Sequence, residues 1–114
     1  MKILIVDDEP ELAELLKFGL EDLSYDVEVK SNPLDALESL KSNSFDLVLT
    51  DNHMPKMTGL ELIQKMPTNI PVFLISGNPT LETDNLGDHF KGVIPKPFDC
   101  NQIHEKIKVF NKND

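Results

Sequence analysis

Residues 45–59, FDLVLTDNHMPKMTG, decide how the rest of the chain is interpreted. The apolar run 47–49 is typical of a buried strand, and it leads almost directly to Asp51. Met54-Pro55 and Gly59 belong to the turn-forming segment that follows. The stretch therefore predicts a carboxylate presented where a buried strand gives way to a loop, which is a common place for functional residues.

Length and charge limit what Asp51 can belong to. At 114 residues the chain has the length of one ordinary domain, so we expect a single domain over residues 1–114 without a separate output domain. The formal net charge is −9, from 11 basic and 20 acidic residues, and every basic residue is a lysine. Phosphate backbones would be repelled and bidentate arginine contacts to bases are missing, so nucleic acid is not an expected partner.

Cysteine content and the N-terminal sequence bear on location. The single cysteine, Cys100, excludes an intramolecular disulfide, fits a reducing compartment and is explained as a small, partly buried apolar residue. The opening apolar run, residues 3–6, meets acidic residues at once and is too short for a signal peptide or a membrane span. We therefore expect a cytoplasmic protein with no membrane partner.

Apolar periodicity divides the chain into alternating strands and helices. Strands are expected at 3–6, 25–30, 45–50, 72–75 and 92–95. Helices are expected from Pro10 through Leu23, from Pro33 after the N-cap Asn32, over 58–66 with a capping box, and after an Asp99 cap. Residues 78–91 keep only an approximate helical period and predict a marginal fourth helix.

Five alternations of strand and helix predict an α/β fold with a parallel sheet covered on both faces. In such sheets, ligands bind beyond the carboxyl ends of the strands. The polar residues that end the apolar runs would therefore share one edge of the sheet. They are Asp7, Asp8, Asp51, Ser76 and Lys96.

This set of side chains suits a hard cation and an anionic group. Neighbouring carboxylates raise one another's pKa unless a positive charge intervenes, and Mg²⁺ prefers oxygen ligands completed by a phosphate oxygen. Asp51 could then attack a phosphoryl group and carry it as an aspartyl phosphate. Lys96 and the metal would stabilise the phosphoryl oxygens, and Ser76 would donate a hydrogen bond to them.

Four motifs in order resemble the receiver domain of bacterial two-component response regulators. They are Asp7-Asp8, the segment from Asp51 through Met54-Pro55 to Gly59, Ser76-Gly77 and Lys96-Pro97-Phe98. The resemblance covers nearly the whole chain and is closest to the single-domain, chemotaxis-regulator type. It implies a doubly wound, flavodoxin-like sheet of order 2-1-3-4-5. It also implies phosphoryl transfer from a histidine kinase or phosphotransfer protein to Asp51, a downstream protein target, and no enzymatic activity beyond its own phosphorylation and dephosphorylation.

The same resemblance implies roles for individual residues. Asp8 and Asp51 would bind Mg²⁺ together with the backbone carbonyl of His53, and Asp7 would act mostly through water. The Lys96-Pro97 peptide bond is expected to be cis. One position departs from the family pattern: Val93 stands three residues before the lysine, where these domains usually carry a tyrosine or phenylalanine that swings inward on phosphorylation.

Three other interpretations remain open at this point. Taken singly, each polar residue could serve only the fold, as a helix cap, a turn residue or a surface charge. A pseudo-receiver would keep the fold as a binding module without phosphorylation. A haloacid-dehalogenase-like phosphatase also uses an aspartate nucleophile with Mg²⁺, but after its first strand as Asp-x-Asp, whereas here Asp7 and Asp8 are adjacent.

Overall fold

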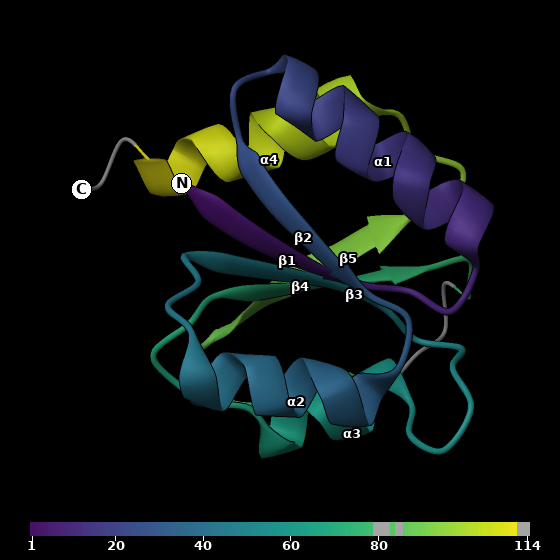
Figure 1. Cartoon of the computed structure of the whole chain (residues 1–114), viewed down its shortest axis with the longest axis vertical. Helices are drawn as coiled ribbons and strands as arrows, with labels where there is room; N and C mark the ends of the chain where they lie inside the picture. The colour runs from purple at the N-terminus through teal and green to yellow at the C-terminus, as the bar shows by residue number, and fades with distance from the viewer. Residues whose placement is uncertain (79–82, 84–85, 112–114) are drawn as a thin grey trace.

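The computed structural model describes residues 1–78, 83 and 86–111, and its strands and helices alternate along the chain as far as the fourth strand, after which the fifth strand is the next described element (Figure 1). The strands are β1 (Lys2–Val6), β2 (Asp26–Lys30), β3 (Leu47–Asp51), β4 (Val72–Ser76) and β5 (Phe90–Pro95). The helices of the described part are α1 (Pro10–Asp22), α2 (Pro33–Ser42), α3 (Gly59–Lys65) and α4 (Cys100–Asn111).

The strands form one parallel sheet of order β2-β1-β3-β4-β5, which confirms the predicted doubly wound fold. Helices α1 and α4 cover one face of the sheet, and α2 and α3 cover the other (Figure 1). In the register, Asp51 lies beside Ile75 and Ser76 lies beside Pro95. The carboxyl ends of the central strands therefore meet at one edge of the sheet.

Successive side chains of the buried strands point to opposite faces of the sheet and form two separate apolar clusters. Strands covered on both faces read as continuous apolar runs, because each face needs its own apolar side chains. The cluster under α2 and α3 includes Leu4, Val48, Leu62 and Leu74. The cluster under α1 and α4 includes Ile5, Leu49, Ile75 and Ile103.

Helix starts follow the predicted capping residues. The side-chain oxygen of Asn32 accepts a hydrogen bond of 2.8 Å from the Leu34 N–H at the start of α2. At α3, Thr58 and Glu61 form both bonds of the predicted capping box. These caps satisfy backbone N–H groups that have no partner inside the helix.

Helix α1 ends in a Schellman motif. The Tyr25 N–H donates to the Leu20 carbonyl at 3.1 Å, and the Ser24 N–H donates to the Glu21 carbonyl at 2.9 Å. Ser24 occupies the left-handed position of this motif with φ 76°. Glycine is the residue that usually fills this position, because a Cβ atom is disfavoured there.

The described part of residues 78–91 differs from the predicted fourth helix. Asn78, Thr83 and residues 86–89 are irregular or form turns, and residues 90–91 begin β5. Strand pairing explains the difference, because the His89 carbonyl accepts from the Val72 N–H at 2.9 Å and Gly87 has φ 104°. The rest of that prediction, residues 79–82 and 84–85, lies outside the described residues.

Candidate functional site

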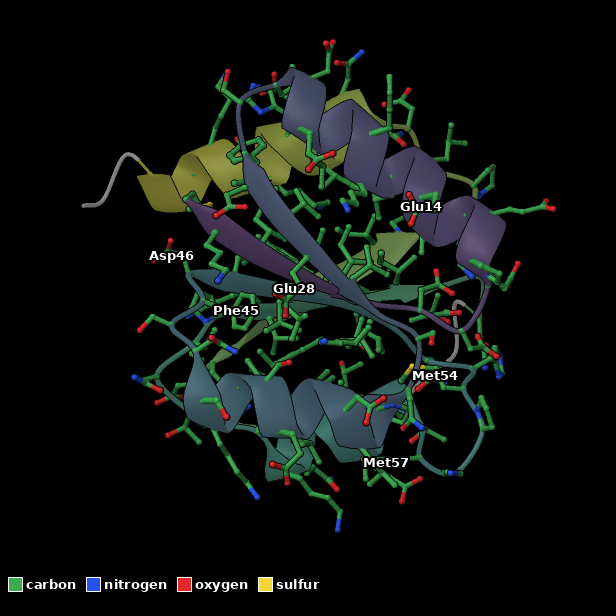
Figure 2. The ribbon with its side chains drawn as sticks, in the orientation of Figure 1. Glu14, Glu28, Phe45, Asp46, Met54 and Met57 are labelled. Carbon is green, nitrogen blue, oxygen red and sulfur yellow. The ribbon has the colours of Figure 1, made fainter. Side chains whose placement is uncertain are left out.

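The candidate site lies at the carboxyl edge of the sheet. Carboxylate oxygens of Asp7, Asp8 and Asp51 all lie within 4.8 Å of one another, which confirms that the ends of β1 and β3 meet there. Figure 2 shows Phe45 and Asp46, which precede β3, at one end of the sheet, and Met54 and Met57, which follow it, at the other. The acidic cluster belongs to the end marked by the two methionines.

The two carboxylate oxygens of Asp51 have different surroundings. Only 1 % of this residue is exposed. Its Oδ1 lies 3.2 Å from Lys96 Nζ and accepts a 2.9 Å hydrogen bond from the Asn52 N–H. Its Oδ2 is buried and has no hydrogen-bond partner within the described part of the chain. A buried oxygen without a partner is costly, so Oδ2 is the natural place for a cation or a reacting group.

Lys96 reaches the site from the end of β5. Its backbone N–H donates to the Ser76 carbonyl at 3.0 Å, which places the lysine directly beside the end of β4. The Lys96-Pro97 peptide bond is cis, as the sequence analysis expected. Strand β3 lies between β1 and β4 in the sheet, so Lys96 and the loop after β1 belong to strands on opposite sides of β3.

Asp7 is a buried acid with a raised pKa. Burial raises the pKa of its carboxyl group from 3.8 to about 6, although the Glu9 N–H donates to Oδ1 at 2.9 Å and acts to lower this pKa. The neighbouring charge of Asp51 raises the Asp7 pKa further, and Lys96 lowers it. Asp7 is thus a carboxyl group whose charge is poorly compensated by the protein itself.

Ser76 and His53 complete the predicted set. Ser76 is buried at the end of β4, and its Oγ accepts a 3.0 Å hydrogen bond from the Asn78 N–H. Accepting this bond leaves the hydroxyl proton able to point elsewhere. His53 is exposed on the loop that follows Asp51. All the residues singled out from the sequence therefore lie at or beside one edge of the sheet.

The loop between β3 and α3 is held tightly against Asp51. The Gly59 N–H donates to the Asn52 carbonyl at 3.0 Å, and a Cβ atom on Gly59 would collide with the Asp51 carbonyl oxygen. The Met57 N–H donates back to the Pro55 carbonyl at 2.9 Å around Lys56, whose φ is 73°. This tight turn brings the chain back so that α3 starts directly on the backbone of Asp51.

Asn52 is a buried polar residue next to Asp51 that its sequence context did not single out. Only 6 % of this polar residue is exposed, and its Oδ1 accepts a hydrogen bond of 3.2 Å from the Leu60 N–H in the first turn of α3. A single polar letter after a strand gives no sign that the side chain will be buried, because its burial depends on how α3 packs.

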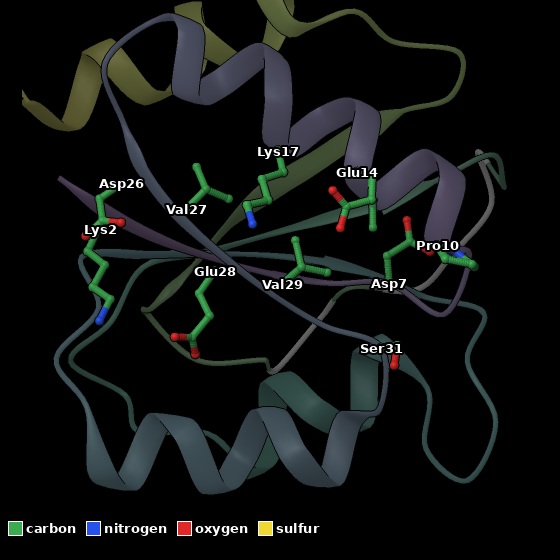
Figure 3. A pocket seen from close by; sticks show the side chains of 11 residues that line it. Lys2, Asp7, Pro10, Glu14, Lys17, Asp26, Val27, Glu28, Val29 and Ser31 are labelled. Atoms are coloured by element: carbon green, nitrogen blue, oxygen red, sulfur yellow. The ribbon is translucent and has the colours of Figure 1, made fainter.

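A hollow of about 570 Å³ lies between α1 and the edge strand β2, beside the candidate site (Figure 3). Asp7 lines it at one end, whereas Asp51 and Lys96 do not line it. Its wall mixes acidic and basic side chains, including Glu14, Glu28 and Lys17. The hollow and the candidate site therefore meet only at Asp7.

Known proteins that are similar to this chain agree with the function suggested by the geometry of the site. Residues 3–108 match the response regulator receiver domain. The chain belongs to this family. This membership supports a phosphoacceptor role in two-component signalling, and receiver domains are generally not enzymes in their own right. Within the described residues, none of the helices has the length and apolar character needed to cross a membrane.

Two curated relatives show how much of each protein is shared. The chain is 37 % identical over 112 residues to a transcriptional regulatory protein CpxR homolog of Haemophilus influenzae, which covers 95 % of the chain and 49 % of the relative. It is 33 % identical over 123 residues to the chemotaxis protein CheY-3 of Vibrio cholerae, with coverage of 98 % and 93 %. The chain thus spans about half the length of the first relative and nearly all of the second.

Among solved structures, the response regulator TrrA of Thermotoga maritima in complex with Mg²⁺-BeF is similar to this chain. Its TM-score is 0.84 at 31 % identity, with 95 % of this chain and 96 % of that chain covered. A CheY-like receiver domain of Methanospirillum hungatei has a TM-score of 0.87 at 28 % identity, with coverage of 98 % and 94 %. Both similarities extend over nearly the whole chain.

Proposed function

We propose that this domain accepts a phosphoryl group on Asp51 from a histidine kinase or phosphotransfer protein. The observation that carries the proposal is the buried Oδ2 of Asp51, which has no hydrogen-bond partner among the described residues and lies beside an Oδ1 already paired with Lys96. A carboxylate oxygen of Asp51 attacks phosphorus, the bond from phosphorus to the donor histidine breaks, and its electron pair stays with the imidazole nitrogen. The product is an aspartyl phosphate.

The residues present fit a Mg²⁺ ion. Three carboxylates lie within 4.8 Å of one another, one of their oxygens is buried without a partner, and Asp7 has a raised pKa. Asp7, Asp8 and Asp51 would hold the ion together with the backbone carbonyl of His53, with Asp7 acting mostly through water. Bound Mg²⁺ supplies positive charge that offsets the negative charge of the phosphoryl oxygens.

In this proposal, Lys96 and Ser76 bind phosphoryl oxygens that the metal does not contact. The Lys96 ammonium already lies 3.2 Å from Asp51 Oδ1, so a short movement brings it to an oxygen of a group bonded to that carboxylate. The Ser76 hydroxyl, at the end of the neighbouring strand, donates a hydrogen bond to the same group. A changed contact of Ser76 would alter the chain that follows β4, and with it the surface offered to a downstream protein.

Helix α1 carries two exposed apolar side chains. Leu15 and Phe18 on α1 are 68 % and 75 % exposed. Leu15 also lines an apolar hollow of about 250 Å³ with Phe98, which follows Lys96 by two residues. We propose that the donor protein docks on Leu15 and Phe18, because neighbouring exposed apolar side chains commonly mark protein interaction sites.

Labelling with acetyl phosphate in the presence of Mg²⁺ tests the acceptor. Asp51→Asn should abolish labelling, because an amide cannot act as the nucleophile. Asp46→Asn is the matched control: it makes the same change just before β3, at the other end of the strand, and should leave labelling intact. Persistent stoichiometric labelling of Asp51→Asn would refute the assignment.

A backbone NMR titration separates the receiver from a pseudo-receiver. Mg²⁺ should shift the amides of Asp7, Asp8 and Asp51, and beryllofluoride, a mimic of the phosphoryl group, should extend the shifts to Ser76 and Lys96. Magnesium binding with no response to beryllofluoride would favour a binding module that does not accept phosphate. Turnover of a generic phosphate ester would instead favour the phosphatase alternative.

A further inference from the structure

Asn52 stands between two members of the proposed metal site. Asp51, the residue before it, supplies a carboxylate, and His53, the residue after it, would supply a backbone carbonyl. Asn52 itself is buried although it is polar, and the proposed chemistry gives it no role. A buried polar side chain is retained in a folded protein when its hydrogen bonds do something that an apolar side chain could not.

Each polar group of the Asn52 backbone is fixed by a neighbour. Its N–H lies 2.9 Å from Asp51 Oδ1 and 3.3 Å from the Ile75 carbonyl oxygen, so it ties the carboxylate to the end of β4. Its carbonyl accepts a 3.0 Å bond from the Gly59 N–H. The peptide units on both sides of Asn52 are therefore anchored to different elements.

The side chain adds a third anchor. Oδ1 accepts a 3.2 Å hydrogen bond from the Leu60 N–H, and since that group is a donor, the amide must present its oxygen rather than its nitrogen. The bond spans eight residues and closes the loop between β3 and α3. Since α3 begins directly against the Asp51 carbonyl at Gly59, this side-chain bond joins the start of the helix to the residue next to the carboxylate.

We infer that Asn52 is a positioning residue for the proposed metal site, whose side-chain clamp on α3 holds the start of the segment that carries the His53 carbonyl in place relative to Asp51. The inference depends on the proposed function, since it assumes that a cation binds there. Residues that orient metal ligands without touching the metal commonly contribute 10–100-fold to metal affinity. Asn52 contacts one ligand, Asp51, directly through its N–H, and its anchored backbone comes immediately before the residue whose carbonyl would be the other ligand.

The test measures the rate of acetyl phosphate labelling as a function of Mg²⁺ concentration. Asn52→Ala should raise the half-saturating Mg²⁺ concentration about tenfold. The rate at saturating Mg²⁺ should stay close to that of the parent protein, because the nucleophile, Lys96 and Ser76 are untouched. Asn52→Asp keeps an acceptor for the Leu60 N–H and should restore the affinity for Mg²⁺.

Thr58→Ala is the matched control for a purely structural effect. Thr58 also accepts one hydrogen bond from the first turn of α3, at 3.2 Å from the Glu61 N–H, but it has no contact with Asp51 among the described bonds. This variant should lower the thermal midpoint as Asn52→Ala does, while leaving the Mg²⁺ dependence unchanged. If Asn52→Ala does not fold, Asn52→Leu fills the same space without an acceptor and takes its place.

Two results would overturn the inference. One is an unchanged half-saturating Mg²⁺ concentration in Asn52→Ala or its substitute, and the other is an equal loss of affinity in Thr58→Ala. Failure of the proposed function is a different observation, because the parent protein would then neither bind Mg²⁺ in the NMR titration nor be labelled. The parent protein therefore tests the site, and the variants test the clamp.

Discussion

Replacing Asp7 with asparagine should stabilise the metal-free protein at neutral pH. Asparagine has nearly the same shape and keeps a side-chain oxygen that can accept the Glu9 N–H, which Asp7 Oδ1 accepts at 2.9 Å. What the substitution removes is a negative charge on a residue that is only 3 % exposed and lies beside the charge of Asp51. The same substitution should weaken Mg²⁺ binding, since it removes an acidic group from the cluster.

The size of the stabilisation follows from the pKa of Asp7. Folding raises this pKa from 3.8 to about 6. Each tenfold change in proton affinity corresponds to 1.36 kcal/mol, so ionised Asp7 costs the folded state about 3 kcal/mol at pH 7. This value is an upper estimate for Asp7→Asn, because the amide must itself be desolvated in the same place.

The pH dependence has a definite sign. The folded protein binds a proton at Asp7 more tightly than the unfolded chain, so the stability associated with neutral Asp7 is present below pH 3.8 and is lost as pH rises through about 6. The difference in unfolding free energy between the variant and the parent should therefore be small at acid pH. It should increase through this range and level off above it.

Urea unfolding followed by circular dichroism, with a chelator present, measures this difference at each pH. Asp26→Asn is a suitable control, because it makes the same change at an exposed position on β2 and should have little effect. Excess Mg²⁺ should stabilise the parent protein and reduce the advantage of Asp7→Asn. A difference that is zero at pH 7, or that does not change with pH, would refute the reasoning.

Two further substitutions test the backbone. Ser24→Gly should stabilise the protein by up to about 1 kcal/mol in urea unfolding, because glycine suits the left-handed C-cap of α1. Labelling with acetyl phosphate should not change. A lower urea midpoint would contradict this account of the turn. Gly59→Ala should destabilise by about 1–3 kcal/mol and reduce labelling, because the added methyl group meets the Asp51 carbonyl and lies 2.6 Å from Leu74 Cδ1; an unchanged midpoint would show that α3 can move away freely.

The sequence was sufficient to predict the sheet and the polar residues that lie at its carboxyl edge. Apolar runs identified the strands, and parallel topology then required their polar end residues to meet. The contact between Lys96 and Asp51 and the clustering of Asp7, Asp8 and Asp51 confirm this reasoning. These predictions succeeded because they depend on strand order and on the residue types at strand ends, not on loop geometry.

The features that the sequence did not predict depend on contacts between distant elements. His89 is buried, and its Nε2 lies 2.8 Å from the Ile63 carbonyl, 26 residues away. Pro67 stands where the helical partner of that carbonyl would be, and it has no N–H to donate. The proline therefore indicates an unpaired carbonyl in α3, but nothing local identifies a histidine before β5 as the group that fills it.

The unequal pairing of the Asp51 oxygens has a consequence for ion selectivity. Lys96 and the Asn52 N–H both contact Oδ1, so a cation that approaches this carboxylate meets a single available oxygen, Oδ2. Ca²⁺ often binds both oxygens of one carboxylate, whereas Mg²⁺ holds an octahedral shell built from single oxygens and water. To bind Asp51 in the manner of Ca²⁺, an ion would first have to displace the lysine. The ion pair would therefore disfavour the larger cation at the proposed metal site, whose charge alone would attract both.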